Sequence, residues 1–386
     1  MIPYGRQSIS QDDIDAVAEV LRSDWLTQGA IVPRFERAVA DRCGAAHAVA
    51  MNSATSALHI ACLALGVGPG DLVWTSPVSF VASSNCARYC GADVDFVDVD
   101  VETANLSPVA LERKLEAAQR NGRLPKVVIP VHLTGQSCDM EAIHALSLRY
   151  GFRIIEDASH AIGGGYRGEP VGSCRYSDVT VFSFHPVKVV TSGEGGMAMT
   201  NDAALAGLME RLRSHGITRE PALLTREPDG PWYYEQIELG FNYRLTDIHA
   251  ALGLSQMGRL EEFVRRRNEI AARYDELFVG LPLRPLGRQQ DAYSAYHLYV
   301  VRLDLPRLSR SHRDVFVALR ERGIGVNIHY IPIYRQPDYA RFGINAQDFP
   351  EAERYYGETI SLPLYADLTE DLQDQVVAAV REVLTP

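Results

Sequence analysis

Between residues 44 and 200, short apolar runs alternate with amphipathic segments that keep a helical period. Short runs rich in β-branched residues are typical of buried strands. They predict strands at residues 94–100, 126–132, 152–157, 178–184 and 196–200. The segments between them predict helices at residues 55–65, 108–120 and 139–150. Strands separated by helices favour an α/β fold, in which helices cover both faces of a mostly parallel sheet.

The last third of the chain follows a different pattern. Residues 246–278 contain no proline and keep a helical period, which predicts one long helix that bridges two domains. Beyond it, the pattern predicts a strand at residues 297–303 and helices at residues 311–322 and 369–384. We therefore expect a large α/β domain at residues 1–250 and a smaller C-terminal α/β domain at residues 251–386.

Composition narrows the class of protein. A net charge of −11 argues against a nucleic-acid partner. No apolar run approaches the roughly 20 residues that a membrane span requires, and the first residues lack the apolar core of a signal peptide. The six cysteines are scattered without a CxxC pair, which predicts reduced thiols and no metal site. We therefore expect a cytoplasmic protein that binds neither nucleic acid nor a membrane.

Lysine is rare in this chain, and one lysine has an unusual position. Three of the 38 basic residues are lysines, namely Lys114, Lys126 and Lys188, and the rest are arginines. Lys188 follows the predicted strand at 178–184, within SFHPVKVVTSGEGG, where a charge needs either a path to solvent or a function. Arginine cannot become a nucleophilic amine, whereas a desolvated lysine can. Lys188 is therefore a candidate catalytic residue, and a surface lysine at a strand end is the alternative.

An acidic residue and a histidine follow another predicted strand. Asp157 ends the run at 152–157, and His160 stands three residues later in EDASHAIGGGY. Ligands of open α/β sheets bind beyond the carboxyl ends of the strands, so Asp157 could face a cationic ligand group. A structural aspartate that binds backbone amides is the alternative. A Ser/His/Asp hydrolase is disfavoured, because no G-x-S-x-G elbow is present and the short spacing orients the pair poorly.

Two further segments could complete a site. Residues 52–55 lie where a strand turns into a helix, and the amides and hydroxyls of a helix start bind anions. An ordinary N-cap by Ser53 is the alternative. Phe80 lies between a proline-containing loop and a helix, where its ring could stack on a planar ligand or pack in the core. No GxxxxGK[ST] motif is present, so a nucleotide P-loop is not expected.

One ligand would use all four features. Pyridoxal phosphate needs a lysine for its imine, an aspartate that keeps its pyridine nitrogen protonated, an anion site and an aromatic ring beside it. The residues alone therefore favour a pyridoxal phosphate enzyme with Lys188 and Asp157 as its catalytic residues.

The chain resembles the sugar-nucleotide aminotransferases of the DegT/DnrJ/EryC1/StrS family nearly end to end. The resemblance is clearest in SFHPVKVVTSGEGG, EDASHAIGGGY, NSATSAL and GFNYRLTDIHAALGLSQ. It implies fold type I of the pyridoxal phosphate enzymes, with Lys188 as the Schiff-base lysine and Asp157 as the partner of the pyridine nitrogen. It also implies a homodimer with shared active sites, in which Asn242 reaches the phosphate from the second subunit. The other implied cofactor contacts are His160 near the ring hydroxyl, Phe80 on the ring, and Ala54, Thr55 and Ser183 at the phosphate, together with Ser53 at the helix start.

Within the family, the chain is most similar to the transaminases that make UDP-4-amino-4,6-dideoxy-N-acetyl-β-L-altrosamine for pseudaminic acid. This similarity is found in MIPYGRQSI, DWLTQG, RSHGI, NIHYIPIYRQPDY and ISLPLY. This similarity implies transfer of an amino group from L-glutamate, through pyridoxamine phosphate, to C4 of a UDP-4-keto-6-deoxy-N-acetylhexosamine. It implies that the nucleotide sugar contacts Tyr4, Asp24, Trp25, Leu26, Thr27, His185, Ile328, His329, Tyr330 and Ile331.

Other reactions remain as alternatives. The chain could aminate a 3-keto sugar or a dTDP- or GDP-linked sugar, dehydrate a keto-sugar, or hold the cofactor without catalysis. Dehydratases of the family replace the lysine by histidine, whereas Lys188 is present here and His185 stands at a different position. The resemblance therefore favours a transaminase.

Overall fold

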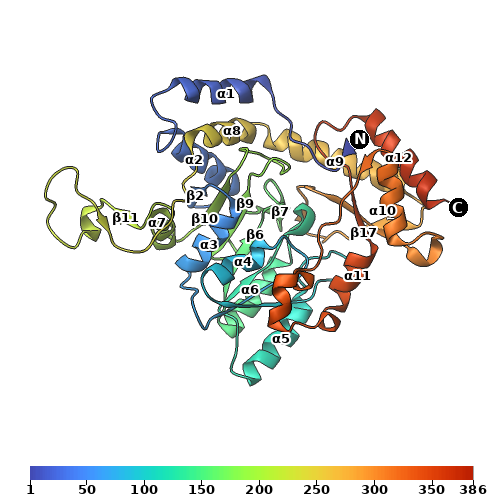
Figure 1. Cartoon of the computed structure of the whole chain (residues 1–386), viewed down its shortest axis with the longest axis horizontal. Helices are drawn as coiled ribbons and strands as arrows, with labels where there is room; N and C mark the ends of the chain where they lie inside the picture. The colour runs from blue at the N-terminus through green and yellow to red at the C-terminus, as the bar shows by residue number, and fades with distance from the viewer. Residues whose placement is uncertain (386) are drawn as a thin grey trace.

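The computed structural model describes residues 1–385, and a seven-stranded sheet lies at its centre (Figure 1). The strands follow the order β2 (His47–Met51), β10 (Gly196–Thr200), β9 (Val179–Ser183), β6 (Arg153–Asp157), β5 (Val127–Ile129), β3 (Leu72–Thr75) and β4 (Asp93–Phe96). β10 is antiparallel to both of its neighbours, and the other pairs are parallel. The predicted α/β class with a mostly parallel sheet is confirmed.

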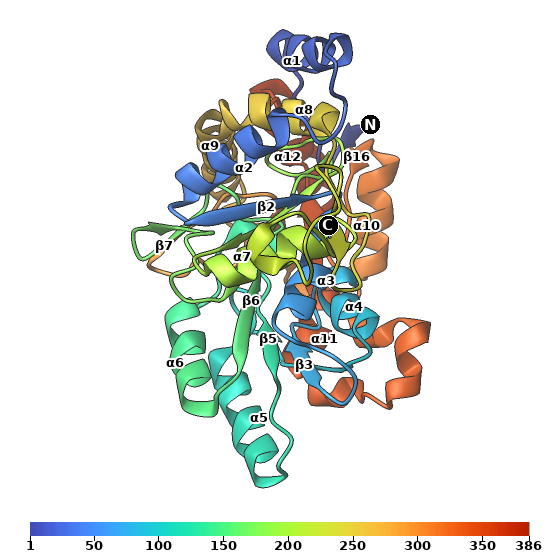
Figure 2. The ribbon, with the colours of Figure 1, turned by 90° about the vertical axis from the view of Figure 1, so that its left-hand side faces the viewer.

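Helices cover both faces of this sheet. They are α2 (Ile31–Cys43), α3 (Ala54–Ala64), α4 (Ala82–Tyr89), α5 (Pro108–Arg120), α6 (Met140–Tyr150), α7 (Ala203–Leu212), α8 (Asp247–Met257) and α9 (Leu260–Leu277). Val179 and Val181 of β9 pack with α3, α4 and α7, whereas Phe182 packs with α2 and α9 on the opposite face. Figure 2 shows α5 and α6 on one side of β5 and β6, and α3 and α4 on the other. α1 (Gln11–Arg22) lies outside, against α8.

The C-terminal part has its own core. β13 (Leu283–Pro285), β15 (Tyr299–Leu303) and β17 (Thr359–Leu362) form an antiparallel sheet that packs with α9, α10 (His312–Glu321) and α12 (Glu370–Leu384). β1 (Ile2–Pro3) pairs with β16 (Ile324–Gly325), so the N-terminal residues lie on this part of the molecule. The predicted domain boundary at residues 250 and 251 stays a prediction.

Smaller elements complete the chain. β7 (Gly165–Tyr166), β8 (Glu169–Pro170) and β14 (Ala292–Tyr293) form a short sheet, and α11 (Pro350–Glu358) precedes β17. β11 (Ile217–Thr218) pairs with β12 (Glu235–Gln236) in an arm that projects away from the sheet (Figure 1).

Most predicted elements lie within two residues of the observed ones, and three differ by more. The single helix expected at residues 246–278 is wrong, because α8 and α9 are separated at Gly258 and Arg259, where Arg259 leaves helical geometry with φ −109° and ψ 5°. The strand expected at residues 94–100 ends at Phe96, and the Asp98 carboxylate accepts the amides of Glu351 and Ala352 at the start of α11. The strand expected at residues 126–132 ends at Ile129, since the following proline has no N–H to donate.

Within residues 1–385, no helix combines the length and the apolar character that a membrane crossing requires. In the same range, no three His, Cys, Asp or Glu side chains are grouped closely enough to hold a metal ion. All six cysteines are buried and unpaired.

Candidate active site

A cavity of about 450 Å³ lies at the carboxyl ends of β2, β3, β6 and β9, where these strands lead into α3, the loop before α4, and two further loops. Most of the residues predicted from the sequence line it, namely Lys188, Asp157, His160, Ser183, Ser53, Ala54, Thr55, Phe80, Tyr4, His185, His329 and Tyr330. Residues from the C-terminal part close the opposite wall. A larger cleft of about 890 Å³ lies along β4 and α5 and contains none of the predicted site residues.

Lys188 lies in the connection between β9 and β10. Its backbone N–H donates to the carbonyl of His185 at 2.9 Å, and Phe184 fixes the two ends of the loop through backbone hydrogen bonds to Ser192 and Gly195. Burial lowers the pKa of the Lys188 amine from its ordinary value of 10.5 to about 8, although the negative charge of Asp157 acts in the opposite direction. About a tenth of this amine is therefore unprotonated at pH 7, far more than for an ordinary lysine, and a nucleophile or a general base requires this unprotonated form.

Asp157 ends β6 with its carboxylate in a dense set of donors. Ser83 Oγ donates to Oδ2 at 2.6 Å, and Ser159 donates to Oδ1 through its hydroxyl at 2.6 Å and its backbone N–H at 3.2 Å. An ionised carboxylate has about four acceptor positions, so these three donors leave one free on Oδ2. Because Asp157 lines the cavity, that position fits the N–H of a protonated pyridine ring.

His160 contributes a hydrogen bond rather than a charge. Burial lowers its pKa well below the ordinary value, and Lys188 and His329 add to the effect, so the ring is neutral. Nδ1 accepts the backbone N–H of Thr134 at 3.2 Å, which places the proton on Nε2, 3.2 Å from the hydroxyl of Tyr330. The Tyr330 oxygen therefore accepts from His160 and keeps its own proton for a group in the cavity.

The start of α3 forms an anion site. Ser53 caps the helix by accepting the N–H of Ser56 at 3.1 Å, and the first-turn amides of Ala54 and Thr55 have no acceptor within the helix. Gly196 is essential to this arrangement, because a Cβ on it would lie 2.3 Å from the backbone nitrogen of Ala54. The site suits the phosphate of the cofactor. An N-cap and a place in the anion site are compatible roles for Ser53, since its hydroxyl caps the helix while the residue lines the cavity.

Phe80 forms one side of the cavity with an exposed ring. Its side chain is 59% exposed, and its ring centroid lies 6.3 Å from that of Tyr330. A phenylalanine in the core would be buried, so the exposure favours the alternative in which the ring stacks on a planar ligand. The amine of Lys188, the carboxylate of Asp157, the start of α3 and the ring of Phe80 together fit pyridoxal phosphate.

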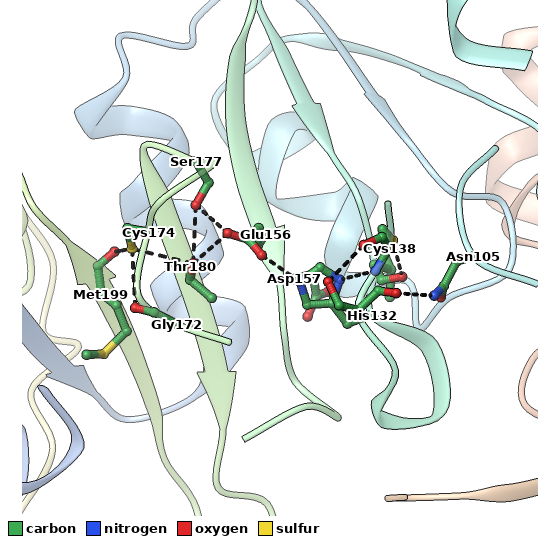
Figure 3. A network of polar contacts seen from close by, with 12 residues as sticks. Asn105, His132, Cys138, Glu156, Asp157, Gly172, Cys174, Ser177, Thr180 and Met199 are labelled. Atoms are coloured by element: carbon green, nitrogen blue, oxygen red, sulfur yellow. Dashed lines mark hydrogen bonds and ion pairs between the residues drawn. The ribbon is translucent and has the colours of Figure 1, made fainter. Parts of the chain in front are cut away.

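A second polar cluster lies behind Asp157, on the other face of β6 (Figure 3). The Glu156 carboxylate accepts from His132 Nε2 at 2.6 Å on one side and from the hydroxyls of Ser177 and Thr180 on the other. The backbone N–H of His132 donates to the carbonyl of Asp157 at 3.0 Å. This cluster holds the end of β6 in place from the side that faces away from the cavity.

Several predicted residues do not line the cavity within this chain: Asn242, Asp24, Trp25, Leu26, Thr27, Ile328 and Ile331. Asn242 is exposed and bridges to Ser214 near the base of the arm. Trp25 and Leu26 are 64% and 45% exposed. Their predicted roles in cofactor and substrate binding stay predictions.

Other residues line the cavity or support it without having been predicted from the sequence, namely Ser79, Ser83, Ser159, Glu194, His297 and Asn327. Nδ1 of His297 is buried without a hydrogen-bond partner among the described residues, so it is available to form a hydrogen bond with a ligand. Ser79 lies in the loop before α4 and Ser83 in its first turn, so helical spacing does not indicate their contact. His297 and Asn327 carry no local signal either, because packing of the C-terminal part brings them to the site.

Known proteins are similar to this chain over nearly its full length. It is 41% identical over 387 residues to the spore coat polysaccharide biosynthesis protein SpsC of Bacillus subtilis, covering 99% of this chain and 97% of SpsC. In structure it is similar to PseC of Helicobacter pylori, an aminotransferase involved in the biosynthesis of pseudoaminic acid, with a TM-score of 0.91, 31% identity and 99% of both chains covered. It is also similar to the putative sugar aminotransferase Spr1654 of Streptococcus pneumoniae in its pyridoxamine phosphate form, with a TM-score of 0.89, 29% identity and 99% of both chains covered. The same protein has also been solved in its pyridoxal phosphate form.

The sequence profile of the DegT/DnrJ/EryC1/StrS aminotransferase family matches residues 7–381. This match leaves six residues before it and five after it, so it spans the sheet, the cavity and the C-terminal part alike. The chain therefore belongs to the DegT/DnrJ/EryC1/StrS aminotransferase family and is a sugar aminotransferase that uses pyridoxal phosphate.

Proposed function

We propose that the enzyme transfers an amino group from L-glutamate to C4 of a UDP-4-keto-6-deoxy-N-acetylhexosamine and forms UDP-4-amino-4,6-dideoxy-N-acetyl-β-L-altrosamine. The observation that carries the catalytic part is that one cavity joins Lys188, Asp157 and the start of α3. The choice of sugar rests on the similarity to PseC across 99% of both chains.

The residues divide the work as follows. Pyridoxal phosphate, when bound, supplies a ring that accepts the electrons released when a C–H bond breaks. Asp157 would accept a hydrogen bond from the protonated ring nitrogen, and the amides of Ala54 and Thr55 with the hydroxyl of Ser183 would hold the phosphate. Lys188 Nζ removes the proton from Cα of the amino donor and later returns a proton to the sugar carbon. Its lowered pKa supports both directions of this transfer.

Residues from the N-terminus and the C-terminal part face the catalytic wall and would select the sugar. Tyr4 lies beside His329, with their ring centroids 5.0 Å apart. His329 Nδ1 lies 2.8 Å from the hydroxyl of Ser361. Burial, and to a smaller extent the positive charge of Lys188, lowers the pKa of His329 to about 3. This wall therefore offers neutral hydrogen-bonding groups and aromatic faces, which suit the hydroxyl and amide groups of an N-acetylated sugar.

We also propose that the enzyme works as a homodimer with shared active sites in the cytoplasm. Asn242 lies outside the cavity of its own chain, as expected for a residue that serves a second subunit. The arm beside it carries large apolar side chains that a second copy could cover, since Trp232 is 70% exposed and Leu239 is 80% exposed. Six unpaired cysteines support a reducing compartment.

A second candidate keeps the reaction and changes the sugar. The identity to SpsC, 41%, is higher than the 31% identity to PseC, so another keto-sugar nucleotide is the alternative substrate. Turnover with L-glutamate across UDP-, dTDP- and GDP-linked 4-keto and 3-keto sugars, followed by mass spectrometry and product NMR, separates the candidates. We expect a new C–N bond at C4 of the UDP sugar, absent in Lys188→Ala. Preferred amination of another sugar, or loss of a hydroxyl without amination, would rule out the first proposal.

A further inference from the structure

Two serines near the cavity form a chain of hydroxyl groups that ends on Asp157. Ser79 Oγ lies 2.7 Å from Ser83 Oγ, and Ser83 Oγ lies 2.6 Å from Oδ2 of Asp157. Both serines are buried, with Ser83 fully enclosed and Ser79 4% exposed. Neither is needed to cap α4, whose first residues make no side-chain cap hydrogen bond.

The direction of the hydrogen bonds in this chain follows from the carboxylate. An ionised carboxylate can only accept, so the single proton of Ser83 must point to Asp157. Ser83 then has no proton for Ser79, and Ser79 must be the donor to Ser83. Both hydroxyl groups are therefore oriented toward Asp157.

The same residues join Asp157 to the aromatic side of the cavity. Ser79 directly precedes Phe80, and the backbone N–H of Ser83 donates to the carbonyl of Phe80 at 3.2 Å. On the other oxygen, Ser159 comes from the loop that follows Asp157 itself. Ser83 is thus the contact that fixes the Asp157 carboxylate relative to a different element of the fold.

We propose that Ser79 and Ser83 are positioning residues for the cofactor. They hold Asp157 as a hydrogen-bond acceptor toward the pyridine nitrogen and tie its position to the loop that carries Phe80. The inference rests on the proposed role of Asp157 and does not depend on which sugar the enzyme aminates.

Cofactor binding provides the test. The dissociation constant of pyridoxal phosphate is measured on wild type, Ser83→Ala, Ser79→Ala, Ser83→Thr and the control Ser84→Ala. Ser84 is the next residue of the same helix, and its hydroxyl contacts Val81 and Tyr339 instead of Asp157. The second measurement is the ¹⁵N NMR shift of ring-labelled pyridoxal phosphate in each holoenzyme, which reports whether the ring nitrogen is protonated. Thermal unfolding of each apo protein accompanies both.

We expect Ser83→Ala to weaken cofactor binding by about tenfold to a hundredfold, the range for a lost hydrogen bond to a charged group. Ser79→Ala removes a bond between neutral groups and should weaken binding by about two- to tenfold. In both variants the ¹⁵N shift moves toward that of an unprotonated ring, whereas Ser84→Ala keeps the wild-type values and Ser83→Thr, which retains a hydroxyl, restores them.

Three results would overturn the inference. One is a wild-type dissociation constant and ¹⁵N shift in Ser83→Ala. Another is equal weakening in Ser83→Ala and Ser84→Ala with matching losses of thermal stability, which would indicate a general packing role. If Ser83→Ala does not fold, Ser79→Ala decides, and wild-type values in that variant would exclude the chain. A wild-type enzyme that binds pyridoxal phosphate yet does not aminate the UDP sugar would refute the proposed substrate and leave this inference intact.

Discussion

The chemical reactivity of Lys188 in the cofactor-free protein can be predicted from its surroundings. Its pKa is lowered from 10.5 to about 8 because burial disfavours the charged ammonium. At pH 7.5, a pKa of about 8 leaves roughly a quarter of the amine neutral, against about one part in a thousand for an ordinary lysine. Lys188 should therefore react with acylating reagents about 200-fold faster than an unperturbed lysine of equal exposure.

The small number of lysines makes this measurable without mutation. Limited acylation of the apo protein between pH 6 and pH 11, followed by peptide mass spectrometry, reports Lys114, Lys126 and Lys188 separately. Lys114 and Lys126 pair with Asp95 at 2.7 Å and Asp71 at 2.9 Å, and they serve as internal references for the reagent. Labelling of Lys188 should reach half its maximum near pH 8 and level off at about pH 9. Labelling that continues to rise through pH 10 would refute the argument from burial.

The same experiment tests the influence of Asp157. The Asp157 charge raises the Lys188 pKa, so Asp157→Asn should move the labelling midpoint below that of wild type. A midpoint that stays or rises would show that the two groups do not interact as the structure implies. The linkage has a definite sign, since the unfolded chain binds more protons than the folded apo protein between about pH 8 and pH 10.5. The unfavourable contribution of Lys188 to apo stability, about 3 kcal/mol below pH 8, therefore disappears as the pH rises through that window.

Two further predictions concern the frame of the site. Gly196→Ala should lower the free energy of unfolding, measured by urea titration, by about 1–3 kcal/mol, because the added Cβ would meet the backbone of Ser53 and Ala54. Gly207→Ala in α7 is the matched control, because a Cβ there would lie 3.7 Å from its nearest atom, in the side chain of Arg211. This variant should be neutral or stabilising in the same titration. Glu156→Leu should destabilise the protein by about 3–5 kcal/mol, because the buried donors of His132 and Thr180 and the half-buried hydroxyl of Ser177 lose their acceptor. Glu156→Gln keeps an acceptor and should lose clearly less stability, and equal losses in the two variants would contradict this account.

The sequence predicted the parts of the site that depend on local pattern. Lys188 and Asp157 each follow an apolar run, and strands of one parallel sheet present their carboxyl ends at the same edge. The sheet therefore brings them together, although 31 positions separate them in the chain. The broken helix at Gly258 was missed because a helical period continues across it and a single glycine is a weak signal. His297 and Asn327 were missed because their place depends on how the C-terminal part packs against the sheet.

The buried histidines of the cavity do not add positive charge beside Lys188. Four histidines line the cavity; His185 is exposed, whereas burial lowers the pKa of His160, His297 and His329, with nearby positive charges adding to the effect. His160, His297 and His329 are therefore neutral at physiological pH and act as hydrogen-bonding groups. Charged histidines so close to Lys188 would lower its pKa further and weaken its ability to carry a proton. Because burial keeps them neutral, the Lys188 amine is left near the pH at which a group can both accept and return a proton, which amino transfer requires in its two halves.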